Sequence, residues 1–121
     1  MPARHSLSFP KSRRLTRASE FERVRQEGRA HRGGLLMLGV LAAKETRGFR
    51  AGFVTSRRLG GAVVRNRVRR RLREIVRKHQ HEIVDAEWIV TIARANAARA
   101  TYHQLEDEWL RLAKRASILA S

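Results

Sequence analysis

Apolar residues recur at helical spacing in the stretch "VVRNRVRRRLREIVRK", residues 63–78. They stand at positions i, i+4, i+8, i+11 and i+12, and they are Val64, Val68, Leu72, Ile75 and Val76. At 100° per residue they fall within an arc of about 120°, which is the width expected of a helix that rests on a sheet. Most of the remaining positions are arginine. The pattern predicts an amphipathic helix with one apolar face and one basic face.

Three other stretches have the pattern of β-strands. "GLLMLGVLAA" (34–43) and "WIVTIA" (88–93) are continuous apolar runs, and "FRAGFVTS" (49–56) alternates between two faces. Only the turn "KETRG" (44–48) separates the first run from the alternating stretch, so we expect these two strands to pair antiparallel. A further short strand is expected near residues 29–32.

Two more helices are expected, one before the strands and one at the end of the chain. In "TRASEFERVRQEG" (16–28), Thr16 can cap the first turn and Gly28 can end the helix in the left-handed conformation. "TYHQLEDEWLRLAKRASILA" (101–120) places its apolar side chains on one face, and Thr101 can cap it. We expect the acidic residues of this last helix on its outer side; they are Glu106, Asp107 and Glu108.

The order of elements, α-β-β-(β)-α-β-α, is typical of an α+β fold. We expect a two-layer α/β sandwich in which helices pack on a mostly antiparallel sheet. The strand-helix-strand unit over residues 49–94 would normally cross over with a right hand. The 121 residues fit a single domain, 15–117, preceded by a flexible basic arm, 1–14, and followed by a short tail, 118–121.

The charge balance predicts the kind of partner. There are 27 Lys and Arg against 11 Asp and Glu, a net charge of +16, and 23 of the basic residues are arginine. The planar guanidinium can hold a phosphate by two hydrogen bonds, so we expect a polyanion. No stretch approaches the ~20 apolar residues of a membrane-spanning helix, which favours nucleic acid over membrane. The lack of cysteine excludes disulfides and thiolate zinc sites, and a cytoplasmic location fits best.

The basic face of the central helix is the main candidate for binding nucleic acid. Like charges at positions 65, 69 and 73 repel one another by roughly a few tenths of a kcal/mol per pair, and such a row is tolerated when an anion neutralises it. Just before the helix, Arg57, Arg58 and a Gly-Gly pair would let a phosphate approach the helix N-terminus.

No catalytic set is present in the sequence. The 11 acidic residues are scattered, and none forms the spaced carboxylates that would hold two Mg²⁺ ions for phosphodiester cleavage. The "HQH" at 79–81 could hold a metal in an extended segment, but a polar helix end is the favoured interpretation. We therefore assign no catalytic residue and no metal ligand, and we expect another component to supply any chemistry.

Phe21 allows two interpretations. On a short helix it most simply packs on the sheet as part of the core. A partly exposed aromatic beside a sheet could also stack on an unpaired base, an interaction worth ~1–3 kcal/mol per base. Arg25, one turn later, could bind the backbone or stack through its guanidinium.

The segment "RAGFVTSRRLGGAVVRNRVRRRLRE" (50–74) resembles the signature of the bacterial ribonuclease P protein component. The family pattern is a strand that ends in Ser with two basic residues, then a Gly, an Ala-Val pair and an Arg-Asn-Arg box leading into a basic helix. "LTRASEFERVRQEG", "EWIVTIARANA" and "TYHQLEDEWLRL" resemble the family's first helix, last strand and last helix. Residues 15–115 thus follow the family in order and spacing.

The resemblance implies the protein subunit of an RNA-based endonuclease that removes the 5′ leader from precursor tRNA, with the chemistry done by the RNA and Mg²⁺. The partners would be the ribonuclease P RNA and the leader, with no protein partner required. By position, the residues that would contact the catalytic RNA are Arg57, Arg58, Arg65, Asn66, Arg67, Arg69, Arg70 and Arg73. Those that would contact the leader are Phe21 and Arg25. The family's crossover is left-handed, and this expectation replaces the right-handed default.

This sequence departs from the family at several positions. Arg25 stands where many members have a second aromatic, so an ionic or guanidinium contact would replace stacking there. Gly39 and its aliphatic neighbours stand where relatives often carry a tyrosine, and Arg57 and Arg58 replace the more usual lysines.

Three other functions compete with this one. A structural RNA-binding protein, such as a ribosomal protein, shares the charge and size, and it would copurify with ribosomal particles. A DNA-binding module could lay the basic helix in the major groove, although arginines without Asn or Gln beyond the first turn favour phosphate contacts over base reading. An autonomous nuclease would cleave without any RNA subunit.

Overall fold

Three helices and four strands make up the fold in this computed structural model, which describes residues 11–44, 48–84 and 87–120. The helices are α2 (Ala18–Glu27), α3 (Ala62–Lys78) and α4 (Tyr102–Arg115). The strands are β1 (Arg29–Arg32), β2 (Leu36–Ala42), β3 (Arg50–Thr55) and β4 (Glu87–Ala93). Short 3₁₀ turns join them: η1 (Lys11–Arg13), η2 (Arg57–Leu59), η3 (Gln80–Glu82) and η4 (Ala95–Arg99). The predicted α+β order is confirmed, including the short strand near residues 29–32.

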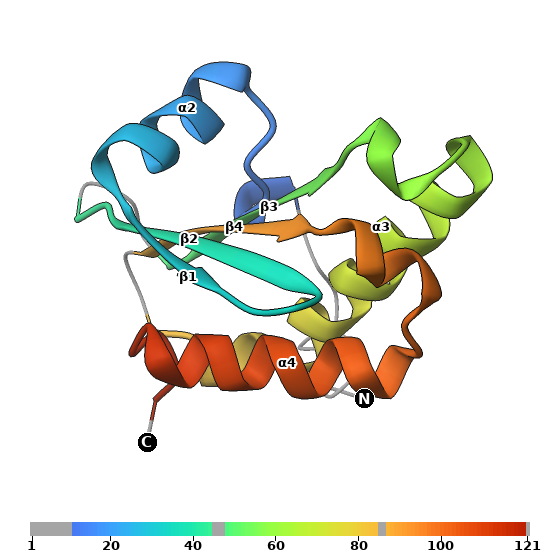
Figure 1. The fold of residues 1–121 in the computed structure, drawn as a ribbon. Helices are drawn as coiled ribbons and strands as arrows, with labels where there is room; N and C mark the ends of the chain where they lie inside the picture. The colour runs from blue at the N-terminus through green and yellow to red at the C-terminus, as the bar shows by residue number, and fades with distance from the viewer. Residues whose placement is uncertain (1–10, 45–47, 85–86, 121) are drawn as a thin grey trace.

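The strands form one mixed sheet in the order β1-β2-β4-β3 (Figure 1). β4 pairs antiparallel with β2 and parallel with β3. The expectation that β2 and β3 pair with each other is therefore wrong, because β4 lies between them. β4 is buried at most of its positions, and a strand that is apolar on both faces is favoured at the centre of a sheet. The seven residues 43–49 between β2 and β3 are enough chain to cross two strand spacings of ~4.8 Å.

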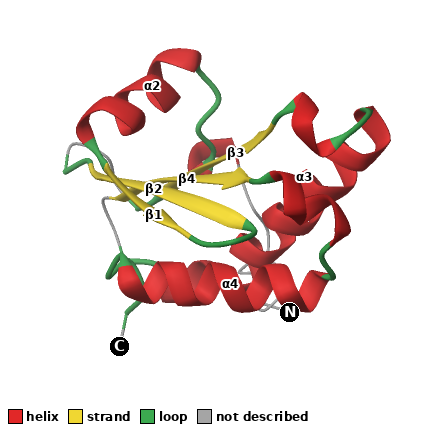
Figure 2. Ribbon diagram, in the orientation of Figure 1, coloured by secondary structure: helices red, strands yellow, loops and turns green. Residues whose placement is uncertain are grey.

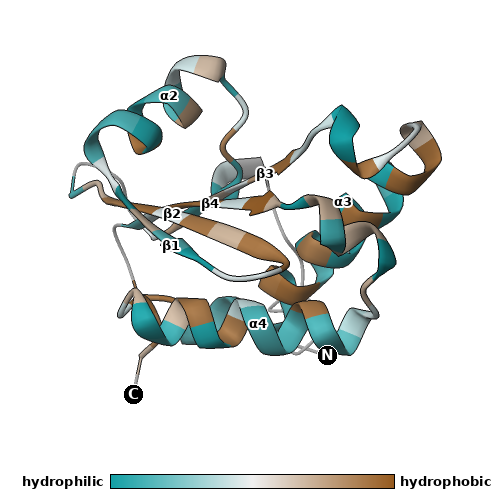
Figure 3. Ribbon diagram, in the orientation of Figure 1, coloured by the Kyte–Doolittle hydropathy of each residue, from teal (hydrophilic) through white to brown (hydrophobic). Residues whose placement is uncertain are grey.

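Helices lie on both faces of this sheet (Figure 2). The larger hydrophobic core lies between the sheet and the helices α3 and α4, whereas α2 packs on the opposite face over a smaller cluster. Figure 3 shows β2 hydrophobic along its length and α2 largely hydrophilic. The hand of the crossover from β3 through α3 to β4 stays a prediction.

The predicted apolar face of α3 is confirmed. Val68, Leu72, Ile75 and Val76 are buried, and Val64 is half-buried. α4 packs beside α3 and contributes Trp109, Leu105 and Leu112 to the same core. The indole N–H of Trp109 donates to the hydroxyl of Thr91 at 3.1 Å, so the one polar atom of this large side chain is satisfied inside the core.

The interactions at the ends of α2 differ from those expected, whereas the N-cap of α4 is the expected residue. Gly28 does not adopt the left-handed conformation, because its φ is −88°. It is needed for a close approach instead: a Cβ there would lie 2.6 Å from the carbonyl oxygen of Val24. A carboxylate oxygen of Glu20 accepts the N–H of Thr16 at 3.0 Å, so Glu20 satisfies the backbone at the start of α2. On α4, Thr101 is the N-cap as predicted and accepts the N–H of Gln104.

Two acidic residues of α4 are buried, although we expected them on the outer side of the helix. Glu106 and Glu108 are 7% and 6% exposed, so the expected outer position is wrong for both. One carboxylate oxygen of Glu108 accepts the N–H groups of Leu35 and Leu36 at 2.7 and 2.6 Å, at the start of β2. These two bonds satisfy the buried carboxylate and fix the start of β2 on α4. Asp107 is exposed as expected.

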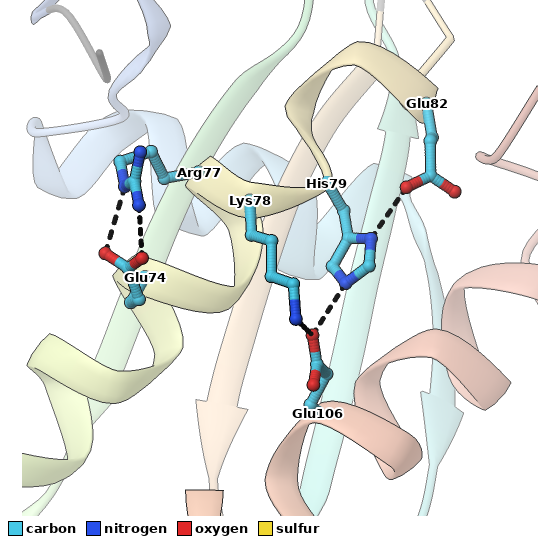
Figure 4. Close-up of polar contacts among 6 residues, drawn as sticks. All are labelled: Glu74, Arg77, Lys78, His79, Glu82 and Glu106. Carbon is cyan, nitrogen blue, oxygen red and sulfur yellow. Dashed lines mark hydrogen bonds and ion pairs between the residues drawn. The ribbon is translucent and has the colours of Figure 1, made fainter. Parts of the chain in front are cut away.

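Glu106 joins α4 to the end of α3 (Figure 4). Lys78 and His79 converge on one of its oxygens at 3.0 and 2.8 Å, and the other ring nitrogen of His79 lies 2.7 Å from Glu82. Burial raises the pKa of Glu106, but the hydrogen bonds from His79 and Lys78 outweigh it and lower the pKa below its usual 4.5. His79 is the C-cap of α3, and the 3₁₀ turn η3 follows it, which confirms the polar helix end inferred for "HQH".

The segments that flank this domain in sequence also pack on it. Residues 11–14, which the sequence analysis places in the basic arm, form η1 and a bridge from Arg14 to Ala51 on the outer edge of β3. The rest of the arm lies outside the described residues. At the other end, Ile118 is buried in the main core and Leu119 bridges to Ile83. Among the described residues, no helix is long and apolar enough to cross a membrane.

Candidate nucleic-acid interface

Some arginines of α3 are held by the protein itself. The Arg67 guanidinium donates to the carbonyl of Ala98 at 3.1 Å, and that of Arg71 donates to the carbonyl of Ala100 at 3.0 Å. Both bonds run from the helix to η4 or the residue that follows it, and they hold this segment against α3. Arg67 is still exposed, so a guanidinium edge is open to a second partner.

Arg69 is fixed in the same way. It donates to the hydroxyl of Thr55 at 2.6 Å and to the side-chain oxygen of Asn66 at 3.2 Å. Thr55 ends β3, so the pair locks the first half of α3 onto the edge of the sheet. Three predicted RNA-binding residues, Asn66, Arg67 and Arg69, therefore also organise the protein surface.

The other predicted arginines have no acidic partner among the described residues; they are Arg57, Arg58, Arg65, Arg70 and Arg73. The one acidic residue of α3, Glu74, pairs with Arg77 instead (Figure 4). Hydrogen bonds to Arg77 account for the lowered pKa of Glu74, which is fully engaged as an anion. These unneutralised cations therefore lie along α3 and on η2, the turn just before it.

The connection from β3 to α3 leaves backbone N–H groups open. Gly60 has φ +136°, a conformation that side-chain-bearing residues rarely adopt, so glycine is required at this turn. Gly61 is the N-cap of α3 and offers no side chain to the first turn. A Cβ at Gly61 would meet nothing within 4 Å, so the approach to these N–H groups is unobstructed. Free N–H groups at a helix start, beside Arg57 and Arg58, favour an anion.

A cleft of about 700 Å³ lies between α2 and the sheet. Its lining is mostly apolar and includes Met37, Gly39, Val54, Val90 and Ile92 from three strands. Gly39 adds no side chain to the cleft, and a Cβ there would lie 3.2 Å from a side-chain carbon of Val24. A cleft with apolar walls can accept the faces of unpaired bases.

Phe21 lies on the wall of this cleft and is half-buried. Its ring rests on Gly52 of β3: a Cβ at Gly52 would lie 2.6 Å from two ring carbons of Phe21. The ring also packs beside the smaller hydrophobic cluster under α2. Both interpretations of Phe21 are thus compatible with its position, since one face packs on the sheet while the side chain also lines the cleft. The alternating sequence pattern of β3 does not predict that the Phe21 ring packs on Gly52.

Arg25 lines the same cleft, and 72% of its side chain is exposed. It forms an ion pair with Glu22, one turn earlier on α2. Hydrogen bonding to Glu22 raises the pKa of Arg25. The spacing of three residues on a helix allows this pairing, which was not among the predictions from the sequence.

Comparison with known proteins decides the family. The sequence profile of the family Ribonuclease P matches residues 9–117. The chain belongs to this family. A ribonuclease P protein component from Roseiflexus sp. (strain RS-1) is 45% identical over 107 residues, which cover 88% of this chain and 87% of the relative. One from Chloroflexus aurantiacus is 43% identical over 107 residues, with 88% and 78% covered.

The fold agrees with the sequence comparison. The structure of the Staphylococcus aureus RNase P protein matches with a TM-score of 0.84 at 29% identity, over 90% of this chain and 99% of that one. The resemblance inferred from the Arg-Asn-Arg box is therefore confirmed, and the chain is a protein subunit of ribonuclease P, a tRNA-processing ribonuclease that contains an RNA. The matches give no support to the alternative of a ribosomal protein.

Proposed function

We propose that this chain binds the ribonuclease P RNA through the basic end of α3 and η2, and that it holds the 5′ leader of precursor tRNA in the cleft between α2 and the sheet. In this proposal the RNA performs the endonucleolytic cleavage that removes the leader. The protein acts in the cytoplasm as a single RNA-binding domain over residues 15–117 and requires no protein partner.

The observation that carries the docking role is the set of unneutralised arginines on α3 and η2. A guanidinium that has no carboxylate nearby gains most from phosphate, because nothing in the protein competes for its charge. Arg70 and Arg58 are exposed and unpaired within the described chain, so they are the strongest candidates for direct contacts. Arg67 and Arg69 would contribute from positions that the protein has already fixed.

The leader role is supported by the cleft around Phe21. Its apolar walls suit bases, and Arg25 at the rim supplies a charge for the backbone. Single-stranded RNA is bound by this combination of aromatic platform and cation, without strong base preference. The cleft and the basic end of α3 meet at the edge of β3, where Phe21 and Thr55 lie on the cleft and Arg69 reaches Thr55.

Mg²⁺ belongs with the RNA in this proposal. The buried carboxylates of Glu106 and Glu108 are used by Lys78, His79 and two backbone N–H groups. Within the described residues there is no group of three or more metal-ligating side chains. These residues therefore do not fit a protein-held magnesium site, and we assign no protein ligand.

The docking role can be tested with two arginine variants. Arg70→Gln removes an exposed, unpaired charge of α3, whereas Arg111→Gln removes an exposed charge of α4 that lies 3.7 Å from Glu108. We expect Arg70→Gln to weaken binding to a bacterial ribonuclease P RNA by about tenfold, and the control to change it less than about twofold. Equal effects of the two variants would mean that net charge, and not this face, binds the RNA.

The leader role needs a different comparison. Reconstituted holoenzyme would be given precursor tRNA with a leader and the same tRNA without one. We expect Phe21→Ala to weaken binding of the first substrate only, by about fivefold or more, since stacking is worth ~1–3 kcal/mol per base. Equal weakening of both substrates would show that Phe21 acts through the fold and not through the leader.

A further inference from the structure

A second, smaller pocket opens beside the cleft at the edge of β3. Its volume is about 190 Å³, and three of its lining residues are arginines: Arg14, Arg69 and Arg73. A water needs roughly 10–15 Å³ of such space, so the pocket has room for a phosphate group with its remaining water. None of the described residues that line it is acidic. We refer to it as the arginine pocket.

The fold places these three guanidiniums from distant parts of the sequence. Arg14 lies along β3 through its bridge to Ala51, and the next residue donates its N–H to the carbonyl of Ala51 at 2.9 Å. Arg69 and Arg73 are one turn apart on α3 and face the same edge. Arg69 is held there by Thr55, so the pocket has one rigid wall before any ligand arrives. A site built on fixed groups loses little side-chain entropy on binding.

Arg73 is the residue that most clearly lacks a partner. Its Nε is buried, and this atom has no hydrogen-bond partner among the described residues. Burial, together with the charges of Arg14 and Arg69, lowers the pKa of Arg73. Glu74, the next residue along α3, is engaged by Arg77 and does not neutralise this group. The charges of Arg14, Arg69 and Arg73 repel one another in this pocket, and an anion bound there would remove that repulsion.

The pocket adjoins the cleft. Thr16, Phe21 and Phe53 line both of them. A strand of RNA with a base against Phe21 would therefore bring an adjacent part of its backbone to the mouth of the arginine pocket. Arginine side chains fit a phosphate in the RNA backbone, because the planar guanidinium can donate to two phosphate oxygens at once.

We propose that the arginine pocket binds one phosphodiester group of the single-stranded RNA that lies in the cleft. The proposal rests on the leader role of the cleft given above. It adds Arg14, which no earlier step assigned, to the leader site. It also moves Arg69 and Arg73 from the surface that docks the catalytic RNA to the surface that holds the leader.

The test uses full-length chain reconstituted with a bacterial ribonuclease P RNA. Arg14→Gln and Arg73→Gln each remove one guanidinium and keep the side chain as far as Cδ with a polar, uncharged end, and Arg111→Gln on α4 is the matched control. Binding is measured for precursor tRNA with a leader and for tRNA without one. We expect each pocket variant to weaken binding of the leader substrate by about tenfold and to leave binding of the leaderless substrate unchanged. Arg14→Gln, at a residue outside the docking surface, should also leave assembly with the RNA unchanged.

A second arm locates the phosphate. In a series of leader substrates, one phosphate at a time is replaced by a neutral methylphosphonate. We expect one position at which the replacement weakens binding by the wild type about tenfold but weakens binding by Arg73→Gln less than twofold, because the contact is already lost. Arg14→Gln should give the same position, and it serves as the deciding variant if Arg73→Gln does not fold.

The outcomes separate this proposal from the leader role itself. If Arg14→Gln weakens assembly with the RNA, or if both pocket variants affect the two substrates equally, the arginine pocket faces the catalytic RNA and the proposal is wrong. If Phe21→Ala shows a leader-specific loss and the pocket variants do not, the cleft binds the leader without this pocket. If Phe21→Ala also lacks a leader-specific effect, the leader role of the cleft fails first.

Discussion

The packing of the Phe21 ring on Gly52 allows a direct test of whether this ring binds the leader in the cleft. A Cβ at Gly52 would lie 2.6 Å from two carbons of the Phe21 ring and 3.1 Å from the Cβ of Leu15. Ordinary carbon–carbon contacts are about 3.5–4.0 Å, so Gly52→Ala must push the ring away from the sheet by roughly 1 Å. The ring is the free end of a half-buried side chain beside an open cleft, so it can move without displacing backbone.

The size of the effect follows from this geometry. Overpacking a closed core costs about 1–3 kcal/mol, and here the open side of the cleft keeps the loss of unfolding free energy near the lower end, at about 1 kcal/mol. The displaced ring no longer presents the same face to a base, and stacking is worth ~1–3 kcal/mol. We therefore expect leader affinity to fall by about five- to tenfold in Gly52→Ala, which is more than the stability change alone would produce.

The assay is a double-mutant cycle on leader affinity in the reconstituted holoenzyme. Gly52→Ala, Phe21→Ala and the double variant are compared, with urea unfolding as the stability control. Because Gly52 acts only through the ring of Phe21, adding Gly52→Ala to Phe21→Ala should change leader affinity less than twofold. Additive losses of the two variants would refute the reasoning, since Gly52 would then act on the leader without Phe21.

Three further predictions follow from single contacts. Glu108→Ala leaves two backbone N–H groups without their acceptor, so the free energy of unfolding in urea should fall by roughly 2–5 kcal/mol. Asp107→Ala, on the exposed side, should change it by no more than about 0.5 kcal/mol. Similar losses in both variants would contradict the buried role of Glu108. Arg70→Gln should flatten the salt dependence of RNA binding by about 0.7–0.9 in slope with an unchanged melting temperature, and a changed melting temperature would point to a structural role instead. The pKa of Glu106 is lowered in the folded protein, so this group stabilises the fold above pH 4.5, and that stability is lost as the pH falls through the lower folded pKa. Glu106→Gln should therefore flatten the fall of the unfolding free energy at acid pH. An unchanged fall would disprove this linkage.

The helix faces could be read from the sequence because helical periodicity is local. Val68, Leu72 and Ile75 repeat at a spacing that only one face of a helix satisfies, and they are all buried. The order of the sheet could not be read in the same way. Whether β3 pairs with β2 or β4 depends on which strand is covered on both faces, and that is decided by packing of the whole chain.

The acidic residues of α4 show a second limit. A charged residue such as Glu108 is usually expected on the outer face of a helix. Its carboxylate instead accepts two backbone N–H groups that lie more than seventy residues earlier in the chain. No local signal points to such a pair. Gly28 is similar, because the close approach of Val40 and Val24, and not the left-handed conformation, requires glycine there.

The candidate site divides along the same line. The arginines of α3 were found because an unmatched row of charge is visible in the sequence itself. Their individual roles were not, since bonds from Arg67 to Ala98 and from Arg69 to Thr55 depend on elements that meet only in the fold. Arg14 was missed altogether, because its place beside α3 comes from a bridge to β3 that no pattern announces.

The central claim is that this chain serves a catalytic RNA and supplies no chemistry of its own. The most direct measurement is 5′ maturation of a precursor tRNA at low Mg²⁺ by a bacterial ribonuclease P RNA, with and without this chain, and by the chain alone. The account predicts cleavage at the leader junction that is weak with the RNA alone, much faster when the chain is added, and absent with the chain alone. Cleavage by the chain alone, or no gain when it joins the RNA, would contradict it.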